Sequence, residues 1–423
     1  MTIAEVNSFP LQMTFLPDVA PHMRRAVTHT EQVTLYRVTL ACGNVGWGDS
    51  ILHAAGYGGA SDGQEFVGQN ALELLRNCLH PGVQMACYDA VGRALAVPAH
   101  TLMGRRVRQR VPFAYWTIDL PPDALARQVQ HAASLGYTVY KFKCRPWWDP
   151  IEQLKAAAEV APPGFKLWLD FNGHLRDART ALPLLKHLCA FELVGGLESP
   201  IPQRDVEGYR RLRAKLDKPI AVHYGAGACH VVSDLSYDPG SSAEVQLREE
   251  LTDGFVLGGG DVDDIRRTAA VCAEFRKPCW LQTVGTALRA AWTAHLVSTC
   301  SAATLSSLSA HDLFERDLAS VPRVVDGYLP VPDGPGLGVE VDEAAVEQLH
   351  SATPKPDPRR LSTVVYPSGV RWHFAGEQQR HEAFYFGQLP GFVRGIRLEL
   401  REDDGSPEFA DLFARCEQSP VVE

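Results

Sequence analysis

The sequence contains no run of about 18 apolar residues, the length that a helix needs to cross a bilayer. Its N-terminus, MTIAEVNSFPLQMTFL, has no basic segment followed by an apolar one, so we expect no signal peptide. A basic run and a patch of mixed basic and aromatic residues are also absent, and the net charge is −9. These absences argue against a membrane span and against a nucleic-acid partner.

Cysteine pairs with the spacing of zinc ligands or of a C-x-x-C redox motif are absent as well. The ten cysteines are scattered singly from Cys42 to Cys416. Several lie in apolar runs, as Cys42, Cys189 and Cys272 do. We expect these three to be small buried side chains in a reducing compartment, which predicts a cytoplasmic protein.

The composition is that of an ordinary folded protein, with 45% hydrophobic and 22% charged residues in a chain of 423. This length is enough for two domains or for one large α/β barrel with additions. The part before about residue 110 has no strand–helix alternation. There we expect a strand over 33–42 and helices over 64–80 and 81–97.

Between residues 111 and 310, short apolar segments alternate with amphipathic segments that are typical of helices. The apolar segments recur about every 25–30 residues, which is the repeat of a (β/α)8-type barrel. A doubly wound sheet is the competing architecture, but no glycine-rich phosphate loop follows its first strand. We therefore predict an α/β barrel with strands over 111–118, 137–144, 165–173, 195–200, 218–225, 253–260, 277–285 and 302–310.

Two regions depart from this repeat. The interval 226–252, between the fifth and sixth strands, is rich in Gly, Ser and Asp and predicts an inserted loop. After residue 310 the chain becomes turn-rich. There 354–358 (PKPDP) predicts a linker, and 362–374 predicts a hairpin.

In a parallel barrel the carboxyl ends of the strands converge on one mouth. The polar side chains expected there are Lys141 and Lys143, Asp170 and Asn172, Glu198, His223 and Tyr224, and Gln282. Carboxylates from neighbouring strands are oxygen ligands of the kind that Mg²⁺ takes, with water and substrate completing its octahedron. An ammonium beside another cation loses proton affinity and can act as a general base. The K-x-K pair therefore suits an anionic substrate held on a metal ion.

Each of these residues alone also has a structural interpretation. A K-x-K pair is more often a solvated strand face. Asp170 could cap a turn, Glu198 could pair with an arginine, and His223 could be a satisfied core histidine. We expect Trp147 and Trp148 to serve packing. What favours a functional site is that three consecutive strands each carry the required group at the same end.

These motifs resemble those of the enolase superfamily, in particular its mandelate racemase/muconate lactonizing enzyme branch, over nearly all of residues 30–345. NVGWGD is similar to the G-W-G-E turn of that branch, and ACYDAVGRALAVPAHTLMGRR to its passage from an aspartate helix toward the first barrel strand. YKFK resembles its K-x-K, LWLDFNG its D-x-N, and LESPIPQRD its metal-ligand passage. DGYLPVPDGPGLGVEVD is close to its closing segment.

The resemblance implies a modified (β/α)7β barrel with Mg²⁺ at its mouth, and an α+β capping domain built from both chain ends. On this basis we expect the capping domain over 1–110 and the barrel over 111–320. Over 321–423 we expect a segment that returns to the capping domain and continues as an extended tail. By position, Asp170 and Glu198 are implied metal ligands and Lys143 the base. Lys141 is then its charge partner or a contact of the substrate carboxylate.

Two loops of the capping domain choose the substrate in this branch, which implies a set of candidate contacts. From those loops they are His22, Arg24, Arg25 and His53, and at the mouth they are Asn172, Tyr224 and Gln282.

Three features depart from the family pattern. The fifth strand supplies His223 where a third acidic ligand is expected. An imidazole can bind a divalent metal, although it favours Mn²⁺, Fe²⁺ or Zn²⁺ over Mg²⁺, and His223 could instead be an acid or a substrate contact. The sixth and seventh strands end in VLGGG and WLQTVG, without the Asp–His pair that racemases use as the opposite-face base. The tail beyond about residue 345 is longer than usual and could cover the mouth or an oligomer interface.

Without a second base we expect one-base chemistry. Lys143 takes the proton next to a carboxylate, and an acid helps a β-hydroxyl leave to give a 2-keto acid; His223, Tyr224 and His174 are the candidate acids. The predicted function is a metal-dependent lyase, a dehydratase of a hydroxylated or sugar acid that acts through an enediolate. A racemase or epimerase of a 2-hydroxy or amino acid derivative is the second hypothesis, and a barrel that only binds a carboxylate is the third. The expected partners are a small carboxylate substrate and, by family analogy, other copies of the chain.

Overall fold

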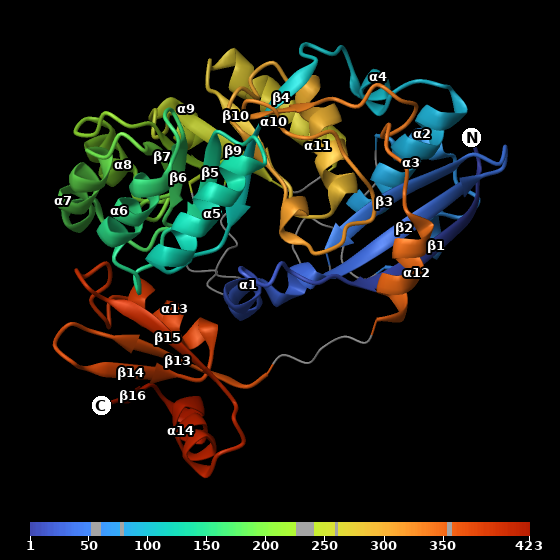
Figure 1. Ribbon diagram of the computed structural model, residues 1–423. Helices are drawn as coiled ribbons and strands as arrows, with labels where there is room; N and C mark the ends of the chain where they lie inside the picture. The colour runs from blue at the N-terminus through green and yellow to red at the C-terminus, as the bar shows by residue number, and fades with distance from the viewer. Residues whose placement is uncertain (52–60, 77–79, 226–240, 259–260, 353–357) are drawn as a thin grey trace.

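The structure is a computed structural model, and it describes residues 1–51, 61–76, 80–225, 241–258, 261–352 and 358–423. These residues form three sheets, one in each part of the molecule. Figure 1 shows the three parts: a cap that contains the N-terminus, a barrel, and a C-terminal module, which we define as residues 358–423. Within the described part of the chain, no helix has both the length and the apolar character needed to cross a membrane.

Parallel strands form the barrel, and the last of them pairs with the first to close it. The strands are β4 (Arg110–Thr117), β5 (Val139–Lys143), β6 (Lys166–Asp170), β7 (Val194–Glu198), β8 (Ile220–His223), β9 (Gly254–Gly258), β10 (Cys279–Gln282) and β11 (Ser307–Leu308). The helices between them are α5 (Pro122–Ser134), α6 (Pro150–Val160), α7 (Ala178–Cys189), α8 (Val206–Arg213), α9 (Ala243–Arg248), α10 (Val262–Glu274) and α11 (Ala287–Ser298). This confirms the predicted (β/α)7β barrel. An added strand, β12 (Tyr328–Pro330), pairs antiparallel with β4.

Local sequence signals start the barrel helices. Asp149 caps α6 by accepting from the backbone N of Ile151 at 3.0 Å, and Pro150 occupies the first turn, where its missing N–H costs nothing. Asp177 caps α7 in the same way. These caps fix where each helix leaves the loop that follows a strand.

The barrel interior is filled by side chains rather than open. Ala221, Val256 and Trp280 form one buried cluster there, and the half-buried Trp168 packs against it, with the two indole rings 5.1 Å apart. Gly196 makes room for it, because a Cβ atom at that position would lie 2.7 Å from the ring of Trp168. The floor of the mouth is therefore aromatic.

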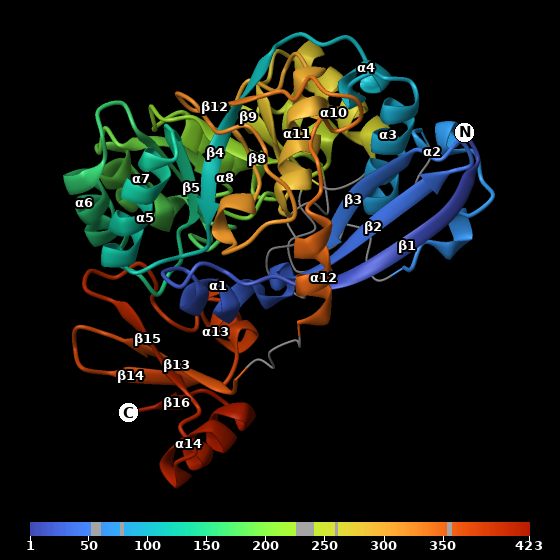
Figure 2. The same ribbon diagram turned by 45° about the vertical axis from the view of Figure 1, so that its right-hand side comes forward.

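The cap is an antiparallel sheet of β1 (Ile3–Gln12), β2 (Gln32–Leu40) and β3 (Val45–Ile51), with α3 (Pro81–Ala94) in contact with β2 and β3. The two glycines of the G-W-G-D motif allow this close contact. A Cβ atom at Gly46 would lie 2.1 Å from the N of Ala90, and one at Gly48 would lie 2.2 Å from the carbonyl oxygen of Gly82. Downstream of the barrel, α12 (Glu343–Ser351) returns and packs on β1, as Figure 2 shows.

Three expectations for the cap need correction. The strand predicted over 33–42 ends at Leu40, and Cys42 is exposed in the turn that follows rather than buried. The helix predicted over 64–80 is wrong. Its described residues form a 3-10 turn at Gln64–Phe66 and the short α2 (Ala71–Leu74). Gly68 separates the two with a φ of +86°, which a continuous helix cannot contain. His53 and most of the predicted insertion 226–252 lie outside the described residues.

The C-terminal module has its own antiparallel sheet in the order β15-β13-β14-β16. Its elements are β13 (Arg360–Val365), β14 (Arg371–Phe374), α13 (Glu377–Tyr385), β15 (Arg397–Glu402), α14 (Pro407–Gln418) and β16 (Val421–Val422). The pairing of β13 with β14 confirms the predicted hairpin. Figures 1 and 2 show α13 at the same end of the barrel as α1 (Ala20–Val27) of the cap.

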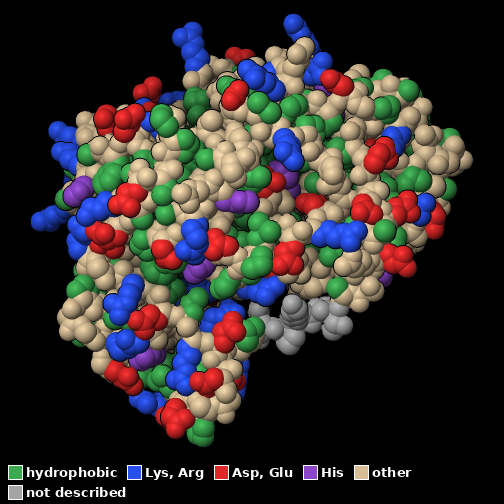
Figure 3. Space-filling model, in the orientation of Figure 1, with side chains coloured by type: hydrophobic (Ala, Val, Ile, Leu, Met, Phe, Trp, Pro, Cys, Tyr) green, Lys and Arg blue, Asp and Glu red, His purple; other side chains and the backbone are tan. Residues whose placement is uncertain are grey.

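The surface carries charges of both signs. On the face shown in Figure 3, Lys and Arg are interspersed with Asp and Glu, without a broad region of one sign among the described residues. This agrees with the absence of a basic run in the sequence.

Candidate active site

Three neighbouring strands end in one row of paired residues. In the parallel register, Lys143 of β5 pairs with Asp170 of β6, and Asp170 pairs with Glu198 of β7. Each is the last residue of its strand, and all three are buried. Residues two apart lie on the same face of a strand, so Lys141 points to the same side from one step deeper in the barrel.

The two ammonium groups bind the carboxylates unequally. Nζ of Lys143 lies 2.6 Å from Oδ2 of Asp170. Nζ of Lys141 lies 2.7 Å from Oε2 and 2.9 Å from Oε1 of Glu198, and 3.1 Å from Oδ2 of Asp170. It also donates to Oε1 of Gln282 at the end of β10. Lys141 therefore bridges both carboxylates, whereas Lys143 contacts one.

This difference moves the pKa values of the two lysines in opposite directions. Burial lowers the pKa of Lys143, and Asp170 offsets this only in part because Lys141 adds positive charge nearby. Burial also acts on Lys141, but Glu198 and Asp170 outweigh it and raise the pKa of Lys141. Burial would raise the pKa of Asp170, yet the two lysines hold it well below its usual value. Of the two lysines, Lys143 loses its proton more readily.

His223 stands on the Glu198 side of the row. Its Nε2 lies 3.3 Å from Oε1 of Glu198. The backbone of His223 is fixed on both sides, since its N donates to Oε1 of Gln203 at 2.6 Å and its carbonyl accepts from Nε2 of Gln246 at 2.9 Å. The imidazole is therefore held at the mouth, next to the carboxylate that Lys141 binds.

Asn172 and Arg145 extend the cluster beyond the strand ends. Asn172 has a φ of +45°, which asparagine tolerates, and its N donates to Oδ1 of Asp170 at 3.1 Å. Its Oδ1 accepts from Nη2 of Arg145 at 2.9 Å. The buried Nδ2 of Asn172 and Nη1 of Arg145 have no hydrogen-bond partner among the described residues. Both can therefore donate to a ligand at no cost in broken hydrogen bonds.

Two other predicted residues are directed away from this row. Val256 belongs to the barrel interior, so its neighbour Phe255 faces the helices, and the ring of Tyr224 packs against Phe255 at 5.3 Å. His174 bonds to the carbonyl of Phe171 through Nδ1 at 2.8 Å. Its Nε2 lies 3.2 Å from Nδ1 of His381 in the C-terminal module. Neither Tyr224 nor His174 is brought together with Lys143.

Of the three residues of helix α1 that were predicted as substrate contacts, His22, Arg24 and Arg25, it is Arg25 that pairs with a residue at the barrel mouth. Nη2 of Arg25 lies 2.7 Å from Oδ2 of Asp119, which follows β4 by two residues. Arg24 instead pairs with Glu31, with Nε 2.9 Å from Oε2. His22 is half-buried, and burial together with Arg25 lowers its pKa. The ion pair of Arg25 with Asp119 thus connects this helix to the barrel mouth.

The C-terminal module closes over the same corner. Oδ2 of Asp119 accepts from the indole N–H groups of Trp147 at 2.7 Å and Trp148 at 2.8 Å. Both tryptophans belong to the apolar cluster of the module, as expected for packing residues. The fully buried Arg380 of α13 pairs with Glu377, and its guanidinium carbon lies 4.2 Å from the centre of the Trp147 ring. The module therefore packs against the side chains that follow β4 and β5.

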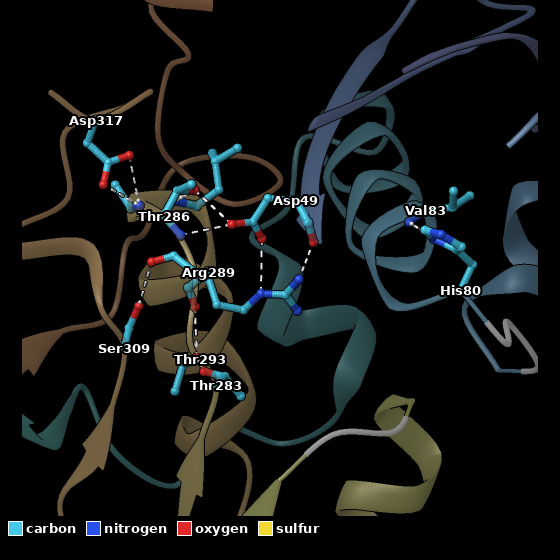
Figure 4. Close-up of polar contacts among 12 residues, drawn as sticks. Asp49, His80, Val83, Thr283, Thr286, Arg289, Thr293, Ser309 and Asp317 are labelled. Carbon is cyan, nitrogen blue, oxygen red and sulfur yellow. Dashed lines mark hydrogen bonds and ion pairs between the residues drawn. The ribbon is translucent and has the colours of Figure 1, made fainter. Parts of the chain in front are cut away.

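The cap meets the barrel at a second point, drawn in Figure 4. Asp49 of β3 points toward the N-terminus of α11. Its Oδ2 accepts from N and Oγ1 of Thr286, both at 2.9 Å, and its Oδ1 lies 3.0 Å from Nε of Arg289. The carboxylate of Asp317 accepts from the N of Ala287 at 2.9 and 3.0 Å. The last residue of the G-W-G-D motif thus caps the helix that follows β10.

Four residues of this region were not predicted from the sequence: Asp119, Arg145, Arg380 and His381. A signal existed for the first two. Asp119 stands in TIDL at the end of a predicted strand, and Arg145 continues the K-x-K alternation by one more step. Arg380 and His381 carry no such signal, because they come from a module outside the barrel repeat.

The donor set at the mouth does not fit a divalent cation. Within the described ranges, no three His, Cys, Asp or Glu side chains are grouped to hold a metal ion. The carboxylate oxygens that would bind one are engaged by the ammonium of Lys141, and His223 brings no negative charge. The assignment of Asp170, Glu198 and His223 as metal ligands therefore stays a prediction.

Comparisons with known proteins agree with this architecture. A family model described as "Enolase C-terminal domain-like" matches residues 124–230 and 258–345. The N-succinylamino acid racemase of Amycolatopsis sp is 30% identical over 221 residues, which are 51% of this chain and 56% of the racemase. This chain thus spans about half the length of that relative. The D-galactonate dehydratase of Xanthomonas axonopodis pv. citri (strain 306) is 26% identical over 302 residues, 64% of this chain and 74% of the dehydratase.

A solved structure shows the same fold. An enolase from Thermobispora bispora DSM 43833, complexed with magnesium and formate, has a TM-score of 0.64 and 21% identity over 83% of this chain and 92% of its own. The family model covers the segment that carries the row of Lys143, Asp170 and Glu198. The closed (β/α)7β barrel, the cap and these matches lead to one conclusion. The chain is a divergent member of the enolase superfamily, in its mandelate racemase/muconate lactonizing enzyme branch.

Proposed function

We propose that the protein removes the proton next to the carboxylate of a hydroxylated acid, with Lys143 as the base. One observation carries this proposal: Lys143 is buried at the barrel mouth, and its Nζ contacts a single carboxylate oxygen at 2.6 Å. Burial and the neighbouring Lys141 lower the pKa of Lys143, which favours the neutral amine that a general base requires.

The charges around the mouth favour an anionic substrate. Before Lys143 gives up its proton, the described basic side chains near the ends of β4–β7 outnumber the carboxylates by one: Arg25, Lys141, Lys143, Arg145 and Arg380 against Asp119, Asp170, Glu198 and Glu377. A buried excess of positive charge is stabilised by an anion. A substrate carboxylate would supply it.

The reaction follows from the roles of the two lysines. The proton on the carbon next to the carboxylate passes to Nζ of Lys143. Negative charge then builds on the carboxylate oxygens, and the protonated Lys141 offsets it from a site shielded from water. When the carbon that loses its proton carries a hydroxyl of its own, the hydroxyl on the next carbon leaves as water once it receives a proton, and the resulting enol becomes a 2-keto acid. His223 is the candidate acid, since it alone of the three expected acids stands beside this row.

The relatives support acid chemistry of this type, and they leave a second candidate. One is named a D-galactonate dehydratase and another an N-succinylamino acid racemase. The higher identity of the racemase favours an epimerase as the second candidate. Against it, the described ends of β9 and β10 carry Gly258 and Gln282, neither of which can move a proton at neutral pH. The proposed reaction uses no metal ion, because the side chains at the mouth do not fit one.

The test is to incubate the protein in D₂O with a panel of sugar acids and N-acyl amino acids. Release of 2-keto acid and incorporation of deuterium next to the carboxylate are measured together. Lys143→Met should lower both by about 10³-fold, the usual contribution of a general base. Lys155→Met, which removes an exposed lysine of α6, is the matched control and should leave both unchanged.

The outcomes separate the hypotheses. Keto acid release that depends on Lys143 supports the dehydratase, and deuterium exchange without loss of water supports the epimerase. If neither occurs with any acid of the panel, the enzymatic proposal fails and a barrel that only binds a carboxylate remains.

A further inference from the structure

The position of Lys141 among its neighbours is that of a bound cation. Its Nζ faces four oxygens: both carboxylate oxygens of Glu198, Oδ2 of Asp170 and Oε1 of Gln282. The side chain is 3% exposed and the two carboxylates are fully buried. An ammonium has three N–H donors, so these oxygens exceed its donors and surround it as a coordination shell would.

The neighbouring lysine provides a comparison within the same strand. Nζ of Lys143 is equally buried, but among the described residues it pairs only with Oδ2 of Asp170. The bridging position is therefore specific to Lys141 and does not follow from burial or from the K-x-K spacing alone.

Charge balance favours this arrangement over a metal ion. Asp170 and Glu198 bring two negative charges, and Lys141 and Lys143 bring two positive ones. A divalent cation added to this cluster would leave two positive charges uncompensated when Lys143 is protonated, and one when Lys143 is the neutral base; either excess is costly in a buried site. The fifth strand, where the family pattern has a third acidic ligand, ends in His223, which cannot supply a negative charge.

The floor of the barrel holds the ammonium in place. The centre of the Trp280 ring lies 6.0 Å from Nζ of Lys141, a distance at which the face of an indole attracts a cation. Trp280 packs in turn on Trp168, for which Gly196 leaves room. Three barrel strands thus support the position of one ammonium.

From these observations we propose that the ammonium of Lys141 is a built-in cation that takes the place of the divalent metal. The protein then binds its acid ligand, and acts on it, without Mg²⁺ or Mn²⁺. The inference concerns the same site as the proposed function and rests on it for the nature of the ligand. Its test needs no turnover.

The experiment titrates Mn²⁺ into chelator-treated full-length protein and follows free Mn²⁺ by electron paramagnetic resonance. The wild type should show no saturable binding up to about 1 mM. Lys141→Met vacates the position between the carboxylates and should bind one Mn²⁺ at least about tenfold more tightly than the wild type. Lys143→Met is the matched control and should bind no better than the wild type. Glu198→Gln, added to Lys141→Met, should abolish the gained binding.

Two results of the titration would overturn the inference. One is stoichiometric Mn²⁺ binding by the wild type that Glu198→Gln removes. The other is no gain in Lys141→Met when its circular dichroism and melting temperature show a folded protein. Deuterium exchange in chelator-treated wild type distinguishes this failure from failure of the proposed function. If exchange requires added Mn²⁺, the inference is refuted but the proposed function is not. If there is no exchange with or without metal, the proposed function is refuted, and the Mn²⁺ titration decides the inference.

Discussion

Two histidines in contact, His174 of the barrel and His381 of α13, make the junction with the C-terminal module sensitive to acid. Burial lowers the pKa of His174 to about 3, and burial together with His174 holds the pKa of His381 well below its usual value. An unfolded histidine titrates near pH 6.5, so below that pH the unfolded chain takes up protons that the folded chain refuses. The stability from these groups is complete above about pH 6.5 and is lost as the pH falls toward 3.

We expect the free energy of unfolding to fall by about 2 kcal/mol between pH 7 and pH 5 on account of His174 alone, with His381 adding to it. His381→Gln should flatten this dependence, because a glutamine does not titrate. Urea denaturation at pH 5, 6 and 7 measures the slope. His187→Gln, at an exposed position on α7, is the control and should leave the slope unchanged. An unaltered slope in His381→Gln would contradict the argument.

How far the site could be predicted differs from residue to residue. The sequence was enough to predict the positions of four site residues, because strand alternation and a common strand end determine where their side chains point. These residues are Lys141, Lys143, Asp170 and Glu198. Tyr224 was predicted at the mouth, but it follows His223 directly, so strand alternation turns its ring to the opposite face, against Phe255. Arg380 and His381 depend on the docking of a separate module, which no local pattern encodes.

At the scale of elements, one carboxylate serves both a helix and the contact between two parts of the molecule. Oδ1 of Asp149 caps α6, while its Oδ2 accepts from Nε of Arg394 and from the N of Gly395, both at 2.7 Å. The cap of α6 and the attachment of the C-terminal module therefore share a single side chain. The sequence predicted the helix but not the second role, because Arg394 lies about 245 residues further along the chain.

Asp149→Ala should lower the free energy of unfolding by about 2 kcal/mol, roughly 1 for the helix cap and the rest for the partly buried hydrogen bonds to Arg394 and Gly395. Asp177→Ala removes a cap of the same type on α7 and should cost only about 1 kcal/mol, since Asp177 has no contact with the module among its hydrogen bonds in the described chain. Urea denaturation of the two variants measures the difference. Equal losses would show that the second role of Asp149 contributes nothing.

At the scale of the whole molecule, Trp147 is the aromatic side chain at the centre of the contact between the C-terminal module and the barrel. Trp147 donates to Asp119, stacks with Arg380 and packs against Phe384 and His381. The barrel and the hairpin of the module were predictable from periodicity, because each follows a local repeat. The docking of one on the other was foreseen only as an open alternative, since it depends on the shapes of two finished surfaces.

Trp147→Phe keeps an aromatic ring but removes the indole N–H and part of the stacking surface. We expect faster amide hydrogen exchange both in α13 and in residues 171–176 of the barrel, because each is protected by the other. Mass spectrometry of peptic fragments measures this. Trp292→Phe, in α11 against Tyr88, is the control and should leave α13 unaffected. Exchange confined to residue 147 and its immediate neighbours would refute a shared dependence.

The position of this module in the chain has a consequence for biosynthesis. A ribosome adds about 5–20 residues per second, so the barrel strands emerge well before residues 377–395. During that interval Trp147 and Trp148, the partly filled mouth and its buried arginines have no cover. The nascent barrel therefore exposes apolar side chains that favour aggregation until residues 377–395 fold onto them. A chain interrupted before α13 would then be a substrate for chaperones rather than a smaller folded protein.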